Sequence, residues 1–157
     1  MINISLKDGS RREYPEGISL LQIAESISSK LAKNAVAALF NHKVMDLNTK
    51  IYHDGELELL DFEDDKSRNV YRHSSSHIMA QAVKRLWPNT KFAIGPAIDK
   101  GFYYDFDTEH IFTPEDFARI EKEMESIIKS NYPIVRKELT KEEAIQFFAE
   151  RNEEYKV

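Results

Sequence analysis

The sequence has 157 residues, 41% hydrophobic and 31% charged, a composition typical of one ordinary domain or two small ones and not of a disordered chain. Its formal net charge of -5 excludes a protein that is basic throughout, so any contact with nucleic acid must be local. The absence of cysteine excludes disulfides and thiolate metal ligands, and no membrane-length apolar run or leader pattern is present, so we expect a cytoplasmic protein without membrane attachment.

The chain opens with a predicted β-hairpin. Apolar and polar residues alternate from Ile2 to Leu6, as in a half-buried strand. Asp8-Gly9 is a hairpin turn signal, so residues 10–14 are predicted to return as the second strand.

A helix and further strands are predicted next. Ser19 and Gln22 form a capping-box pattern, after which apolar residues recur at helical spacing as far as Leu31. Short strands are predicted at residues 36–40, 43–46 and 56–60, with another near Ile51. A helix laid across one face of such a mixed sheet is the ubiquitin-like β-grasp arrangement, so we assign residues 1–62 to a β-grasp domain.

A charged segment separates this domain from the next. Residues 61–69, DFEDDKSRN, are almost free of apolar side chains, as is typical of a linker between compact units. We therefore place the domain boundary after Phe62 and assign residues 63–157 to a second domain.

The second domain also has an α+β pattern. Its predicted elements are a helix from Val70 to Trp87, strands at residues 91–94 and 101–107, a helix from Pro114, a strand at residues 132–139 and a final helix over residues 144–149. Pro88 ends the first helix, Thr113 is placed to cap the second, and Thr140 with Glu143 forms a capping-box pattern before the last. The fold class predicted for the whole chain is α+β.

The sharpest candidate site is the pair His73 and His77. Residues four apart lie on one face of a helix, so both imidazoles can converge on one water or ion. The apolar stripe of this helix lies roughly opposite the pair, which is therefore not part of the core. Spacing alone leaves two interpretations open, a solvated pair or a functional one. Only His110 and carboxylates remain as further ligands in this domain, so no metal site is predicted.

Longer motifs surround this pair. RHSSSHIMAQAVKRLWP and KFAIGPAIDKGFYYDFD resemble the editing domain of threonyl-tRNA synthetases, in which HS(C/S)(A/S)H and IGPxIxxGFYYD recur in this order. The opening IxLKDGS and the capped helix LLQIAESIS resemble the TGS domain that precedes editing in the same family. Alanyl-tRNA synthetases and freestanding editing proteins carry related histidine pairs but normally no amino-terminal TGS domain, so the domain order favours the threonyl family.

The resemblance implies hydrolysis of serine wrongly attached to threonine tRNA. A pocket gains only roughly 1–3 kcal/mol from one methyl group, which explains the need for a second, hydrolytic site. The positions matching the family pocket are His73, His77, Lys156 and Tyr104. A histidine would act as the base and Lys156 as the cation for the developing oxyanion. The family supplies a further Cys and His through a CxxxH element, which is absent from this sequence.

The resemblance also implies partners and cofactors. The chain is expected to be an amino-terminal portion whose editing domain is incomplete, and Lys84 and Arg85 are predicted to touch tRNA phosphates. No cofactor is expected in this portion; ATP, magnesium and zinc would belong to the absent aminoacylation core, as would the contacts of a homodimer. The expected partners are threonine tRNA and mischarged seryl-tRNA. The alternatives are a freestanding TGS-containing module that binds RNA or protein, and a freestanding deacylase, which the missing CxxxH element disfavours.

Overall fold

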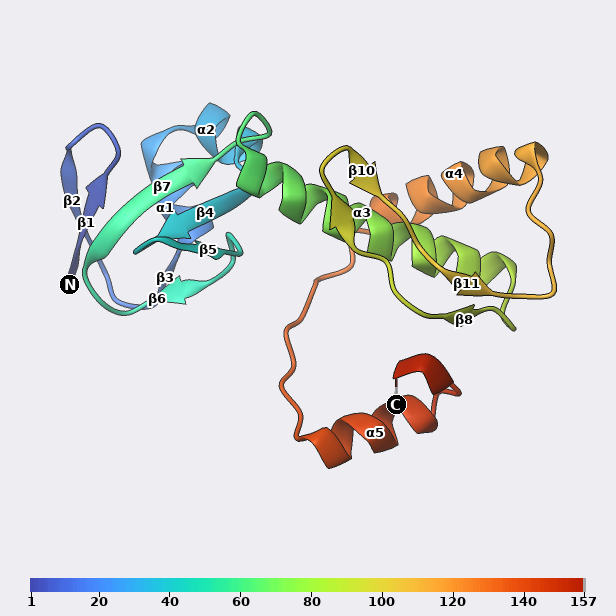
Figure 1. Ribbon diagram of the computed structural model, residues 1–157. Helices are drawn as coiled ribbons and strands as arrows, with labels where there is room; N and C mark the ends of the chain where they lie inside the picture. The colour runs from blue at the N-terminus through green and yellow to red at the C-terminus, as the bar shows by residue number, and fades with distance from the viewer. Residues whose placement is uncertain (157) are drawn as a thin grey trace. The chain divides into compact units, whose positions relative to one another are not determined.

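The computed structural model describes residues 1–156 and divides the chain into two compact units, Met1–Tyr71 and Arg72–Val157 (Figure 1). Both units combine helices and strands, which confirms the predicted α+β class. The division falls within helix α3 (Asp65–Leu86), after Tyr71, and the domain boundary after Phe62 stays a prediction. Within residues 1–156, no helix is long and apolar enough to cross a membrane.

The first unit is built on a mixed five-stranded sheet. Its strands are β1 (Ile2–Leu6), β2 (Arg11–Tyr14), β4 (Ala37–Phe40), β5 (Lys43–Met45) and β7 (Gly55–Leu60), in the spatial order β2-β1-β7-β4-β5. Strands β1 and β7 pair in parallel and the other neighbours are antiparallel. Strands β3 (Ile18–Ser19) and β6 (Lys50–Ile51) form a separate ladder, which confirms the short strand predicted near Ile51.

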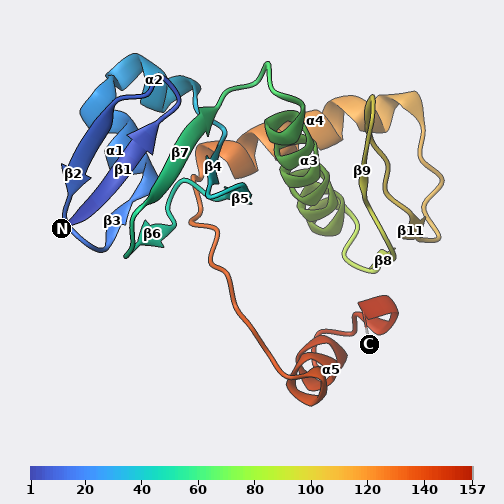
Figure 2. The ribbon, with the colours of Figure 1, turned by 60° about the vertical axis from the view of Figure 1, so that its left-hand side comes forward.

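Two short helices replace the single helix predicted in this unit. The capping box of Ser19 and Gln22 starts α1 (Leu20–Ile27) as predicted. Ser28 then adopts an extended backbone that ends α1, and its side chain accepts from the Leu31 amide to cap α2 (Ser29–Asn34). The helices lie against one face of the sheet (Figure 2), and Leu20 and Ile23 of α1 are fully buried in the core. This arrangement is the predicted β-grasp.

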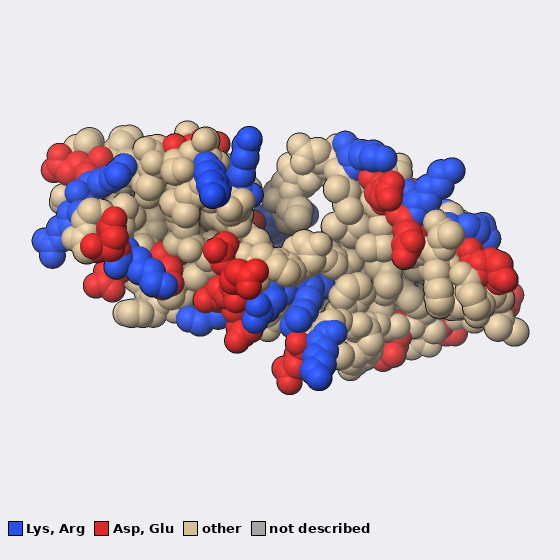
Figure 3. Space-filling view, turned by 90° about the horizontal axis from the view of Figure 1, so that it is seen from above, with Lys and Arg blue, Asp and Glu red and all other residues tan. Residues whose placement is uncertain are grey.

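Most charged side chains lie on the surface, and Asp116 is buried. Basic and acidic residues are intermingled on the face of the molecule drawn in Figure 3. That face therefore carries no field of a single sign, in keeping with the small net charge.

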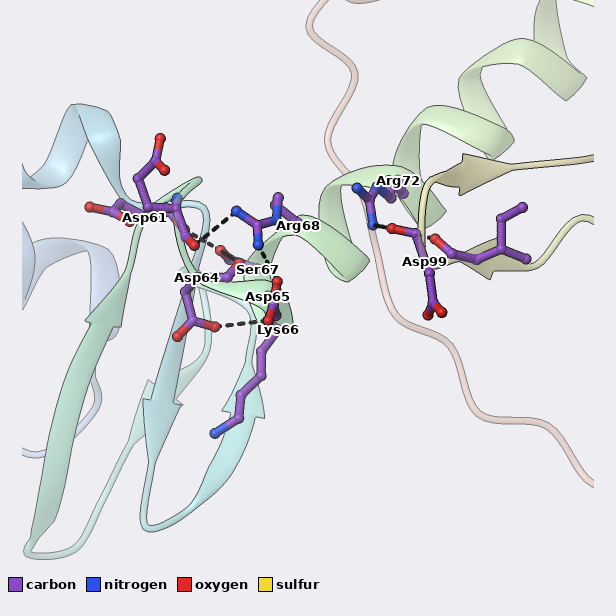
Figure 4. A network of polar contacts seen from close by, with 10 residues as sticks. Asp61, Asp64, Asp65, Lys66, Ser67, Arg68, Arg72 and Asp99 are labelled. Atoms are coloured by element: carbon purple, nitrogen blue, oxygen red, sulfur yellow. Dashed lines mark hydrogen bonds and ion pairs between the residues drawn. The ribbon is translucent and has the colours of Figure 1, made fainter.

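Local capping explains why helix α3 begins at Asp65 and not at Val70 (Figure 4). The Lys66 amide donates to the Asp64 carboxylate at 2.8 Å, and the buried Ser67 hydroxyl donates to the carbonyl oxygens of Asp61 and Asp64. The first bond satisfies one of the N–H groups that a helix start leaves unpaired, and the Ser67 bonds fasten the preceding chain to the first turn. The polar residues that resemble a linker in sequence are therefore the cap and first turns of a helix.

The second unit places short strands and two further helices around the rest of α3. Strand β8 (Lys91–Phe92) pairs with β11 (Phe106–Asp107), and β9 (Ala97–Ile98) pairs with β10 (Gly101–Phe102). The predicted hairpin is thus two short ladders. Helix α4 (Pro114–Lys129) begins after Thr113 and α5 (Lys141–Ala149) after Thr140, as predicted, and a short helix η1 (Glu154–Lys156) follows.

The strand predicted at residues 132–139 is wrong. These residues are extended but belong to no ladder in the part of the chain that the structure describes, and Ile134 is 88% exposed. Apolar alternation reflects the intrinsic preference for an extended backbone, whereas a strand also needs a hydrogen-bonding neighbour.

Candidate functional site

The two histidines of helix α3 form a direct pair. The Nε2 atoms of His73 and His77 lie 3.0 Å apart, and the rings meet edge to face with centroids 4.6 Å apart. Both side chains are exposed, whereas Ala82 and Val83 of the same helix are buried, so the pair lies outside the core as predicted. A hydrogen bond between two Nε2 atoms needs one N–H and one lone pair, so the rings share a single proton at this position.

Ser76 anchors the helix beside the pair. Its hydroxyl is fully buried and lies 2.7 Å from the carbonyl oxygen of His73 and 3.0 Å from that of Gly95. The second of these bonds ties α3 to the segment just before β9. The sequence does not single out this serine, because its partner at Gly95 becomes a neighbour only through the fold.

Tyr104 packs tightly on the same segment. Its ring stacks on Phe106 with centroids 5.1 Å apart and lies so close to Gly95 that a β-carbon there would be 2.7 Å from Cγ of the ring. Partial burial raises the pKa of the Tyr104 phenol above its ordinary value, and the Glu153 carboxylate raises it further. The hydroxyl is therefore a stable donor near neutral pH.

Lys156 lies on η1, and its charge affects the pKa of His77. Its Nζ donates to the carbonyl oxygen of Ala93 at 2.6 Å, which attaches η1 beside β8. Partial burial lowers the pKa of the His77 imidazole, and the charges of His73 and Lys156 lower it further. His77 is thus biased toward its neutral form, the form that can accept a proton.

The two predicted tRNA-contacting cations pair within the chain. Lys84 Nζ lies 3.1 Å from Glu153 Oε1, and Arg85 lies 2.8 Å from Glu123 Oε1 on α4. Hydrogen bonds to Glu123 and then to Tyr132 raise the pKa of the Arg85 guanidinium. Their contact with tRNA stays a prediction.

The remaining histidine of this unit belongs to a different cluster. His110 Nε2 lies 2.7 Å from Asp116 Oδ2, and its ring stacks on Trp87 with centroids 4.4 Å apart. Among the residues that the structure describes, no three His, Asp or Glu side chains could hold a metal ion together.

The site and fold can now be compared with known proteins. Residues 2–61 match the TGS domain model, so the first unit is a TGS domain. The chain is 73% identical over its full 157 residues to the threonine–tRNA ligase of Syntrophomonas wolfei, and 59% identical over 154 residues, 98% of the chain, to that of Caldanaerobacter subterraneus. The ligase of Carboxydothermus hydrogenoformans is 54% identical over 157 residues.

These matches confirm the resemblance drawn from the motifs. The chain carries a TGS domain, and over 98% to 100% of its length it is similar to threonine–tRNA ligases. The chain spans 24% to 25% of the length of these relatives.

Proposed function

We propose that this chain is the amino-terminal part of a threonyl-tRNA synthetase, and that its second unit supplies part of a pocket that hydrolyses seryl-tRNA formed on threonine tRNA. The observation that carries the proposal is the direct His73–His77 pair, next to which Lys156 contributes a cation. Three of the four residues matched by resemblance interact with one another. His73 and His77 share a hydrogen bond, and the charge of Lys156 lowers the pKa of His77. Tyr104, the fourth, packs on the segment that Ser76 fastens to the helix.

The proposed chemistry is hydrolysis of the ester that joins serine to the ribose of tRNA. A neutral imidazole of the pair accepts a proton from water as the water oxygen attacks the ester carbonyl. The Lys156 ammonium donates to the oxyanion that develops, and the bond from the carbonyl carbon to the ribose oxygen then breaks. The imidazolium returns the proton to that ribose oxygen, which gives free serine and tRNA.

The pairing of the histidines suits this step. When one ring accepts a proton, the other can accept a hydrogen bond from the new imidazolium at the observed 3.0 Å separation. A hydrogen bond with one charged partner is about twice as strong as a neutral one, so this bond offsets part of the cost of protonating a ring whose pKa is lowered.

Aminoacylation belongs to the rest of the longer protein in this proposal. ATP, magnesium, zinc and the contacts of a homodimer are assigned there, and a cytoplasmic location is expected for a protein that acts on tRNA in translation. The proposed partners of this segment are threonine tRNA and its mischarged seryl form.

A misacylation experiment tests the proposal. The full-length protein is incubated with serine, ATP and threonine tRNA, and seryl-tRNA is followed over time. The wild type should leave little seryl-tRNA, whereas the His73→Ala and His77→Ala variants should accumulate it while still charging threonine. Equal accumulation by wild type and variants would reject the editing role and favour a TGS-containing module that only binds RNA or protein.

A further inference from the structure

Lys84 has the surroundings of a structural cation. Its Nζ donates to the carbonyl oxygen of the fully buried Thr90 at 3.0 Å and lies 5.4 Å from the centroid of the Phe92 ring. The same nitrogen forms the ion pair with Glu153 at 3.1 Å. Thr90 follows α3, Phe92 lies in β8 and Glu153 follows α5, so three parts of the second unit converge on one ammonium group.

Glu153 belongs to the segment that carries Lys156. Its carbonyl oxygen accepts from the Lys156 amide at 2.9 Å, which sets the first turn of η1, and its own amide donates to the carbonyl oxygen of Phe148 on α5 at 3.0 Å. The segment also contacts β11 through the Tyr155 hydroxyl, which donates to Asp107 at 2.8 Å. The attachments through Glu153 and Tyr155 differ in exposure to solvent. The Glu153 side chain is only 18% exposed, whereas Tyr155 is 55% exposed.

We propose that Lys84 and Glu153 form a clamp that positions Lys156 beside the His73–His77 pair. Lys84 is then a positioning residue for the hydrolytic site and not primarily a phosphate contact. The catalytic meaning of the clamp rests on the proposed editing function, whereas its effect on the position of Lys156 does not.

The energetics favour a clamp over an incidental surface pair. A fully exposed ion pair contributes little to stability, but here the carboxylate is mostly covered and lies close enough to Tyr104 to raise the pKa of its phenol. Removal of Lys84 would leave a mostly covered carboxylate without its cation, which is unfavourable unless the carboxylate moves into water. Movement of Glu153 would carry η1, and with it Lys156, away from its place.

The neighbouring residue provides a matched control. Arg85 also extends from α3 to an acidic partner, with side-chain exposures of 37% for Arg85 and 26% for Glu123 against 38% and 18% for the clamp. Its partner lies on α4 and not beside η1. Arg85→Met therefore removes one cation from the same helix and leaves the attachment of Lys156 intact.

The experiment is an NMR titration of the His77 ring in this chain. The charges that lower the pKa of His77 are those of His73 on its own helix and Lys156 on η1, and Lys84 is not among them. Lys156→Met should raise the pKa of His77. Lys84→Met and Glu153→Ala should produce a rise of similar size, whereas Lys84→Arg and Arg85→Met should leave the pKa at the wild-type value.

A double variant tests whether Lys84 acts through Lys156. Adding Lys84→Met to Lys156→Met should raise the pKa of His77 no further, because the cation that the clamp positions is already gone. An unchanged pKa in Lys84→Met, an unchanged pKa in Lys156→Met, or an equal rise in Arg85→Met would each overturn the proposal. Amide spectra of each variant establish that the fold is retained, and Lys84→Arg serves as the conservative replacement.

A second arm separates the clamp from the proposed function. In the full-length protein, Lys84→Met should slow single-turnover hydrolysis of seryl-tRNA by roughly 10- to 100-fold, since a displacement of about 1 Å can cost two orders of magnitude. Lys84→Arg should restore most of the rate. If the His77 titration behaves as expected but hydrolysis does not depend on His73, the clamp stands and the editing function fails.

Discussion

Gly95 provides a test of how tightly the candidate pocket is packed. A β-carbon at this position would lie 2.7 Å from Cγ of Tyr104 and closer still to two other ring carbons. Carbon atoms in contact are normally about 3.5 Å apart or more, so Gly95→Ala requires the ring or the backbone to move by at least about 0.8 Å. The ring has little freedom to move, because it stacks on Phe106 and meets Phe92 edge to face. Overpacking of this kind typically costs about 1–3 kcal/mol.

The single tryptophan makes this cost measurable in the second unit. Trp87 is the only tryptophan in the sequence and follows α3 in that unit, so its fluorescence during urea unfolding reports on the unit that contains Gly95. Gly95→Ala should lower the free energy of unfolding by about 1–3 kcal/mol. In a Tyr104→Ala background the same substitution should cost much less, because the opposing ring is gone. An equal cost in both backgrounds would refute the packing argument.

Three further predictions concern the second unit. The hydrogen bond from His110 is the largest cause that lowers the pKa of the Asp116 carboxyl below its ordinary value of 3.8. The stability that this carboxylate contributes is therefore present above pH 3.8 and is lost as the pH falls through the lower pKa of the folded state. Asp116→Asn should flatten the loss of stability below about pH 4 in an acid titration. Ser76→Ala should cost about 1–3 kcal/mol in urea unfolding, because it removes a buried hydrogen bond, and an equal cost for Ser74→Ala would contradict this reason. Zinc should be lost on dialysis against a chelator, because the two imidazoles of the pair leave a tetrahedral site two ligands short; one retained equivalent would contradict it.

Local signals carried most of the fold prediction. The Asp8-Gly9 turn and the capping boxes at Ser19 and Thr140 depend on residues within a few positions of one another, and each is present as expected. Two features were missed. The polar run before α3 resembles a linker, although Asp64 caps the helix by accepting from the Lys66 amide. The segment around Ile134 lacks the neighbouring strand that its alternation suggested, and that neighbour would have to come from a distant part of the chain.

The candidate site divides in the same way. The approach of His73 and His77 follows from helical spacing alone and is present at 3.0 Å. The positions of Tyr104 and Lys156 could be anticipated only from family resemblance, because each reaches the region through tertiary structure. Nothing in the sequence pairs Lys84 with Glu153, so the clamp could be inferred only from the structure.

The central claim is that the His73–His77 pair takes part in hydrolysis, and a single-turnover assay with preformed seryl-tRNA on threonine tRNA tests it most directly. Seryl-tRNA is mixed with an excess of wild-type or His73→Ala full-length protein, and the release of serine is followed and corrected for hydrolysis without enzyme. The loss of a general base should slow release by roughly 100-fold or more while threonine charging stays nearly intact. If both proteins release serine at the same rate, the pair is solvated and has no catalytic role.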